Sequence, residues 1–273
     1  MVDGEKLRKI AEVACDAAVS NGAEFADVSA YYGKNLSVDI ESSAIKSSDA
    51  RLSGGISVRA IYRGGTGWSS CDALTPEAAA EAGASAAKLS RLAEPDPDFV
   101  SLPQPVASYP EVPGLADRAI AELDIGQMIK YSLANIDEAL AVSPGTIVGG
   151  GFSSHYHSGA LVNSLGVSLA RDGSYVGGHI MAVIRSGDDV GSFYDFDGAR
   201  TLPDFEPTGI GTKATQQALK FMGARKIDTG RMAIVLGPLA SNSVIYGVVG
   251  SADAEGVQRG RSFMAGISLY QYL

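Results

Sequence analysis

The chain of 273 residues is poor in side chains that cross-link a fold or ligate metals, with two cysteines and three histidines. Cys15 and Cys71 could form one bridge, which a chain of this size does not need. Cys15 falls on the apolar face of a predicted helix, where a buried free thiol is expected. No uninterrupted apolar run reaches the roughly 18 residues of a membrane helix, and the amino terminus lacks an apolar signal core. We therefore expect a cytoplasmic protein without a membrane partner.

Positive charge is also scarce. Lys and Arg number 22 against 31 Asp and Glu, which gives a net charge of -9 and an isoelectric point of about 4.8. A protein that binds duplex DNA needs a dense cationic face to release counterions, and the sequence contains no run of Lys or Arg. We therefore expect no nucleic acid partner. The hydrophobic fraction of 45% is enough for a sizeable core, in one large domain or two ordinary ones.

The first third of the chain alternates between helical and strand-like patterns. Apolar residues at helical spacing predict a helix over residues 4–20, and Thr75 with Pro76 marks the start of a second helix that reaches about residue 92. Between them, alternating residues predict strands, namely 25–32, 36–40 and 56–62, with a hairpin through 63–67 into 68–70. These elements predict an α+β module over residues 1–93.

Six prolines lie between residues 94 and 114. Prolines at this density cannot remain in a helix or a central strand. We predict an extended linker over 94–114, which forms the clearest domain boundary of the chain.

The rest of the chain reads as an antiparallel β-rich part with flanking helices. Helices are predicted over 124–141 and 209–222 and from about Pro238. Strands are predicted at 146–151, 159–163, 167–170, 178–185, 191–197 and 232–236, with turns at 164–166 and 171–173. The pattern indicates a β-rich middle domain over 115–205 and the start of a C-terminal domain over 206–273. The predicted fold class of the whole chain is α+β.

Five short motifs occur in a recognisable order. They are residues 21–28 (NGAEFADV), 54–59 (GGISVR), 65–69 (GTGWS), 161–166 (LVNSLG) and 256–266 (GVQRGRSFMAG). Together they resemble the TldD/PmbA family of peptide-processing proteins, also called modulators of DNA gyrase. The resemblance implies a zinc-dependent peptidase in which two related chains pair around an enclosed chamber and act on unfolded or extended peptides.

The helix that follows residues 232–236 separates two branches of that family. In the catalytic branch this helix carries His-Glu-x-x-x-His and holds zinc. Residues 241–251 here (SNSVIYGVVGS) contain no His, Glu or Cys, the residue types that bind zinc. The chain is therefore similar to the PmbA, or TldE-like, branch, which implies a subunit with no catalytic, cofactor-binding or metal-ligating residue of its own. Zinc is expected in a TldD-type partner, and the chain is not expected to be catalytic alone.

Family members continue through a long C-terminal β-rich region beyond the Gly-Arg-Ser-Phe-x-Ala-Gly block. This sequence stops soon after that block, so we expect a shortened C-terminal domain. The early stop is compatible with a short natural variant or with a truncated chain.

Two alternatives remain open at the level of sequence. His155 and His157 on one strand would share a face, since side chains alternate with period two. His179 from a neighbouring strand could complete a zinc or iron site, with Asp188 and Asp189 as further ligands, in an independent metal hydrolase. The second alternative is a homodimer that binds another protein without chemistry.

Arginines near the C-terminal end form the last candidate site. Arg259 and Arg261 flank the turn at 256–260, and their forked guanidinium groups suit a peptide carboxylate or a partner protein. A structural salt bridge explains them equally well.

Overall fold

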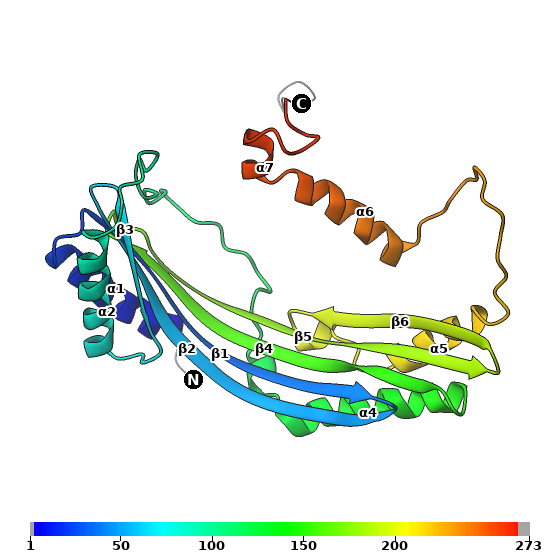
Figure 1. Cartoon of the computed structure of the whole chain (residues 1–273). Helices are drawn as coiled ribbons and strands as arrows, with labels where there is room; N and C mark the ends of the chain where they lie inside the picture. The colour runs from blue at the N-terminus through cyan, green and yellow to red at the C-terminus, as the bar shows by residue number, and fades with distance from the viewer. Residues whose placement is uncertain (1–2, 267–273) are drawn as a thin grey trace. The chain divides into compact units, whose positions relative to one another are not determined.

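The computed structural model describes residues 3–266, which form the predicted α+β fold. All strands of this part of the chain belong to one antiparallel sheet of order β3-β2-β1-β4-β5-β6 (Figure 1). In chain order the elements are α1 (Gly4–Ser20), β1 (Phe25–Glu41), β2 (Ala44–Tyr62), β3 (Gly65–Cys71), α2 (Pro76–Ser90), α3 (Arg118–Glu122), α4 (Ile125–Val142), β4 (Ile147–Asn163), β5 (Ser168–Ser186), β6 (Asp189–Ala199), the 3-10 turn η1 (Leu202–Asp204), α5 (Ile210–Lys220), α6 (Pro238–Ser251) and α7 (Ala254–Gln258).

The helices begin at capping residues. The Asp3 carboxylate accepts a hydrogen bond from Lys6 N at 2.8 Å and caps α1, and Thr75 and Asp124 cap α2 and α4 in the same way. Cys15 is buried on α1 and free, as predicted, and its burial raises the pKa of the thiol to about 11. Local chemistry therefore fixes these helix starts.

The strands are longer than their sequence patterns predict. Residues 171–173, predicted as a turn, lie within β5, where Arg171 pairs with Gly159 of β4. The predicted turn at 164–166 is confirmed, with Gly166 at a φ of 99°. Exposed polar residues break the apolar alternation inside β1, β2 and β5. The backbone hydrogen bonds to the neighbouring strands continue through these positions, so the strands do not end there.

Two hydrophobic cores lie on the same face of the sheet. Even-numbered side chains of β1 contribute to both, Val28 and Ala30 to the first and Leu36 and Val38 to the second. The first core is closed by α1 and α2 and the second by α4 and α5 (Figure 1). The strand residues of both cores all lie on this face, and we call the opposite face of the sheet the open face.

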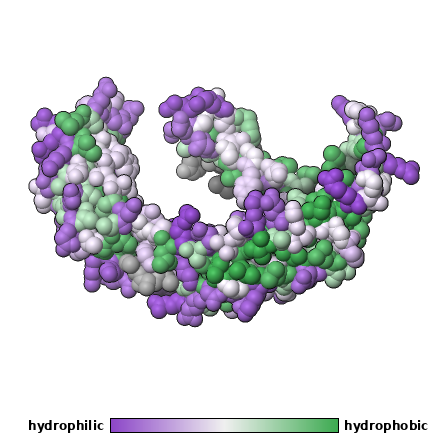
Figure 2. Space-filling model, turned by 60° about the horizontal axis from the view of Figure 1, so that its bottom comes forward, coloured by the Kyte–Doolittle hydropathy of each residue, from purple (hydrophilic) through white to green (hydrophobic). Residues whose placement is uncertain are grey.

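The helical side of the sheet is turned forward in Figure 2. Hydrophobic residues gather over its lower middle and right part in this view, with hydrophilic residues around them. The exposed hydrophobic side chains of α4 and α5 include Leu133 and Leu219, which are 45% and 41% exposed. Single exposed apolar residues of this kind are normal on a soluble surface and mark no site by themselves.

The proline-rich segment contains no helix and no strand, and it connects α2 to α3 (Figure 1). Pro95 forms an isolated bridge with Gly65, Leu102 is buried, and Asn163 Nδ2 donates to the carbonyl of Pro103 at 2.8 Å. The sheet itself continues across this segment, since β1 pairs with β2 on one side and with β4 on the other. The division into domains at 94–114 stays a prediction.

The described chain falls into two compact units, the first ending at Ala224 and the second starting at Arg225. The second unit holds α6 and α7. Residues 232–236, predicted as a buried strand, are extended but unpaired there, and Ile234 and Val235 are 74% and 96% exposed. A strand needs a ladder partner, and no described residue supplies one. The last seven residues of the predicted C-terminal domain, 267–273, lie outside the described part.

None of the described helices combines the length and the apolar character that a membrane crossing requires.

Candidate functional site on the open face of the sheet

The open face carries a series of exposed aromatic side chains. Tyr31 and Trp68 lie toward the α1–α2 end, and Tyr175, Tyr194 and Phe196 toward the other end; their exposed fractions run from 42% to 58%. Aromatic side chains gain much stabilisation when they are buried, and Tyr and Trp are enriched at interfaces. Exposed rings that recur along one sheet face indicate a surface that contacts another molecule.

Glycines let these rings lie flat against the sheet. The ring of Tyr175 covers Gly177 and Gly198, and a Cβ atom at either glycine would collide with its hydroxyl oxygen. The ring of His157 covers Gly173, where a Cβ would lie 2.5 Å from Cε1 of the imidazole. Glycine at these positions therefore keeps the face shallow and leaves room for the rings.

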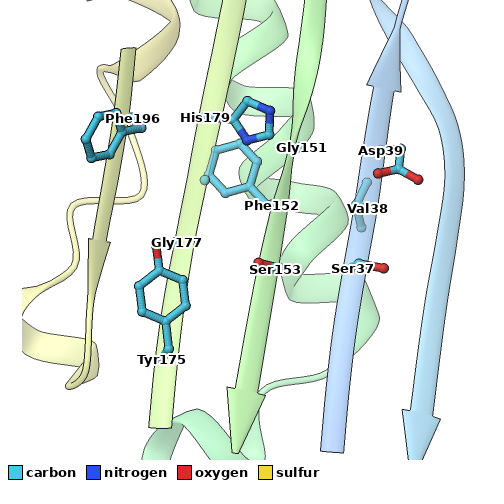
Figure 3. Close-up of a pocket in the computed structure, with 11 residues that line it drawn as sticks. Ser37, Val38, Asp39, Gly151, Phe152, Ser153, Tyr175, Gly177, His179 and Phe196 are labelled. Atoms are coloured by element: carbon cyan, nitrogen blue, oxygen red, sulfur yellow. The ribbon is translucent and has the colours of Figure 1, made fainter. Parts of the chain in front are cut away.

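Two hollows of the open face meet at Tyr175. The smaller has a volume of about 390 Å³ and is shown in Figure 3. Its polar and aromatic lining includes Ser37, Asp39, Ser153, Tyr175, His179 and Phe196. The larger, of about 810 Å³, is lined chiefly by Tyr31, Asn35, His155, His157, Tyr175 and Arg200. Strands β1, β4, β5 and β6 thus build one continuous surface around Tyr175.

The structure brings only two of the three histidines together. His155 and His157 share the open face of β4, as predicted. His155 pairs with Tyr175, whereas His179 pairs with Gly151, four residues further along β5, a distance of about 13 Å along a strand. Within residues 3–266, no group of three His, Cys, Asp or Glu side chains could hold a metal ion.

The two proposed oxygen ligands are also apart from the histidine pair. Asp188 and Asp189 lie at the hairpin between β5 and β6, and the Asp189 carboxylate accepts from Gly223 N at 2.7 Å. The three-histidine site is therefore not formed, because the register of β4 and β5 separates its members.

His155 occupies a partly buried position in the larger hollow. Its Nδ1 lies 2.5 Å from Oδ1 of Asn35, and its ring stacks on that of Tyr175 with centroids 6.3 Å apart. Burial lowers the pKa of His155, and the neighbouring imidazole of His157 lowers it further. Both effects favour the neutral imidazole.

We expect His155 to titrate below the ordinary histidine pKa of about 6.5. The measurement is an NMR titration of the imidazole resonances in the folded chain and in urea. Because the unfolded chain binds this proton more readily, the free energy of unfolding should fall as pH drops from about 6.5 through the folded pKa. A folded midpoint at or above the value in urea would contradict the burial of this ring.

Arg259 and Arg261 share one partner in the second unit. Glu255 Oε1 lies 3.4 Å from Nε of Arg259 and 2.9 Å from Nη2 of Arg261. These pairs are exposed and contribute little to stability. The contacts agree with a structural salt bridge, and a role in binding a peptide or a partner stays a prediction.

Helix α6 does not fit zinc. Its fourteen residues offer serine, asparagine and tyrosine as their only polar side chains, and zinc in peptidase sites is held by imidazole, carboxylate or thiolate groups. The helix begins at Pro238, as the sequence predicts.

The residues of the larger hollow were largely missed at the level of sequence. Tyr31, Tyr175 and Arg200 carry no motif, and only Tyr194 and Phe196, two positions apart in the predicted strand 191–197, show from the alternation that they share a face. That alternation identifies a face of the sheet, but it does not say which rings from different strands meet.

Comparison with protein families defines the class. Residues 26–90 match the model of the PmbA/TldA metallopeptidase domain 1, and residues 118–221 match the PmbA/TldA metallopeptidase central domain. The chain belongs to the PmbA/TldD metallopeptidase family. The resemblance seen in the sequence motifs is thereby confirmed, and the gap between the two matches contains the proline-rich segment.

Solved structures share the fold. TldE from Thermococcus kodakarensis aligns with a TM-score of 0.71 at 24% identity, over 77% of this chain and 47% of that one. A protein described as a proposed modulator of DNA gyrase from Bacteroides thetaiotaomicron aligns with a TM-score of 0.84 at 22% identity, over 94% and 60%. Its counterpart from Thermotoga maritima gives 0.74 at 17% identity, over 94% and 58%. The chain thus spans about half to three fifths of each relative's length. No curated protein matches it.

Proposed function

We propose that this chain is the zinc-free, TldE-like subunit of a cytoplasmic metallopeptidase that acts on unfolded peptides. The observation that carries the proposal is the composition of α6, which has no side chain that ligates zinc. The sequence resemblance implies that this helix corresponds to the zinc helix of the catalytic branch. Attack on a peptide bond by metal-activated water needs a Lewis acid and a base. In this proposal, a TldD-type partner supplies both.

The open face supports a role in holding the peptide. Its aromatic rings and shallow hollows offer contacts to an extended chain of any sequence, since rings pack against side chains without demanding one partner. The chain's own residues would thus bind and orient the peptide and wall the chamber. Pairing with the catalytic chain, rather than with a second copy of itself, is part of the proposal.

The test is reconstitution with a TldD-type chain that carries His-Glu-x-x-x-His. We expect no cleavage of an unfolded peptide by this chain alone, cleavage by the pair, and loss of that cleavage with EDTA. The amount of bound zinc should equal that of the TldD-type partner and should not increase when this chain is added.

The control is the TldD-type chain alone. It shows whether this chain increases the peptidase activity of the partner or whether the partner cleaves the peptide equally well by itself. Chelator-sensitive hydrolysis by the isolated chain would contradict the proposal. Binding of peptide with no cleavage in any combination would instead support the non-enzymatic homodimer.

A further inference from the structure

The larger hollow of the open face has a cation and several hydrogen-bond donors in its lining, and none of its lining residues is Asp or Glu. Arg200 supplies the formal charge, and Ser53, His157 and Tyr175 add polar groups. The adjoining smaller hollow differs, because Asp39 lies in its wall. In a chain with a net charge of -9, a hollow without a carboxylate is complementary to an anion.

The position of Arg200 is fixed by a buried contact. The hydroxyl of Ser174, a residue only 2% exposed, donates to the carbonyl of Arg200 at 2.6 Å and accepts from Asp117 N at 2.7 Å. The residue itself is exposed, and no salt bridge within residues 3–266 involves it. The backbone of Arg200 is thus fixed by a hydrogen bond, while its guanidinium forms no ion pair among the described residues. This arrangement suits the bidentate binding of a carboxylate.

Rings stand beside these donors. Tyr31 and Tyr175 both line the hollow, and the stacking of Tyr175 on His155 holds its ring in place. An apolar side chain that enters next to the carboxylate would therefore meet aromatic surface. The C-terminal residue of a peptide brings these two groups together on one carbon, whereas an Asp or Glu side chain brings a carboxylate alone.

We propose that this hollow binds the C-terminal carboxylate of an extended peptide that ends in an apolar residue. Arg200 holds the carboxylate, the ring of Tyr175 contacts the last side chain, and the preceding residues extend toward the smaller hollow. The inference rests on the proposed function only in taking peptides as the ligands of the open face.

The test measures binding rather than cleavage. A short unfolded peptide with a fluorescent amino terminus and a C-terminal leucine is titrated with this chain alone, as the free acid and as the C-terminal amide, and followed by anisotropy. We expect the amide to bind about tenfold more weakly, the loss of one charge-assisted contact. Arg200→Gln should remove this preference. Arg171→Gln, an exposed arginine on the same strand face outside both hollows, should retain it.

A third peptide, amidated but with an internal glutamate, separates the two sources of carboxylate. Equal binding of acid and amide would overturn the proposal, as would equal losses in the two arginine variants or binding of the glutamate peptide as tight as that of the free acid. If Arg200→Gln fails to fold, the comparison of acid and amide on the unaltered chain decides. The experiment uses neither partner nor zinc, so its outcome is independent of whether reconstitution gives a peptidase.

Discussion

Phe152→Ala should lower the free energy of unfolding by about 4 kcal/mol, as expected when a large ring is deleted from a core. Phe152 is 1% exposed and belongs to the core beneath α4 and α5. Its ring fills the space that Gly178 leaves by lacking a Cβ, and Tyr131 lies 6.3 Å away between centroids. The surrounding backbone cannot close over the cavity, because it is held in the sheet ladder. Denaturant unfolding followed by circular dichroism measures the loss.

The matched control for Phe152 is Phe196→Ala on the open face of the same sheet. Phe196 is 49% exposed, so its removal deletes little buried surface and should cost less than about 1 kcal/mol. Similar losses for the two variants would mean that the open face is buried in solution and that the assignment of faces is wrong.

Gly67→Val should destabilise the fold by about 3 kcal/mol through overpacking. Gly67 lies on β3 directly against α2, and a Cβ there would collide with the carbonyl of Ala86 and the amide nitrogen of Ser90. These obstacles are backbone atoms, so no rotamer change can relieve them, and α2 must shift away from the sheet. We expect the thermal midpoint to fall by about 6–12 °C.

Gly159→Val is the control for Gly67. It is also a strand glycine, but the nearest atom to its Cβ is the carbonyl oxygen of Ala30 at 3.9 Å, an ordinary contact. Its thermal midpoint should stay within about 2 °C of the unaltered chain, since valine favours strands. A midpoint for Gly67→Val as high as that of the control would show that α2 does not pack as described.

Sequence reasoning succeeded where structure is set locally. The apolar spacing over residues 4–20 predicts α1, Thr75 and Pro76 mark the start of α2, and the prolines of residues 94–114 exclude a helix or a central strand there. Each of these depends on contacts within a few residues, which the sequence displays directly.

Features set by strand register were harder to predict. The turn at 164–166 sets the pairing of β4 with β5, and this pairing places His179 opposite Gly151 and away from His155. The second turn predicted at 171–173 would have ended the strand early, so this register was not recognised from the sequence. The hollow around Tyr175 needs four strands in their correct alignment, and no periodicity within one strand reveals that. The unpaired state of residues 232–236 likewise depends on what lies opposite them, not on their apolar composition.

The central strand β1 has a consequence for synthesis on the ribosome. Its residues pair with β2 soon after they emerge, but their second set of partners follows more than a hundred positions later, as in the pairing of Ile40 with Gly150. Until β4 is translated, the nascent hairpin carries an unsatisfied edge together with apolar side chains that await α4. Such an intermediate is a template for aggregation. We therefore expect the yield of soluble product to rise when translation is slowed by cooling or when chaperones are co-expressed.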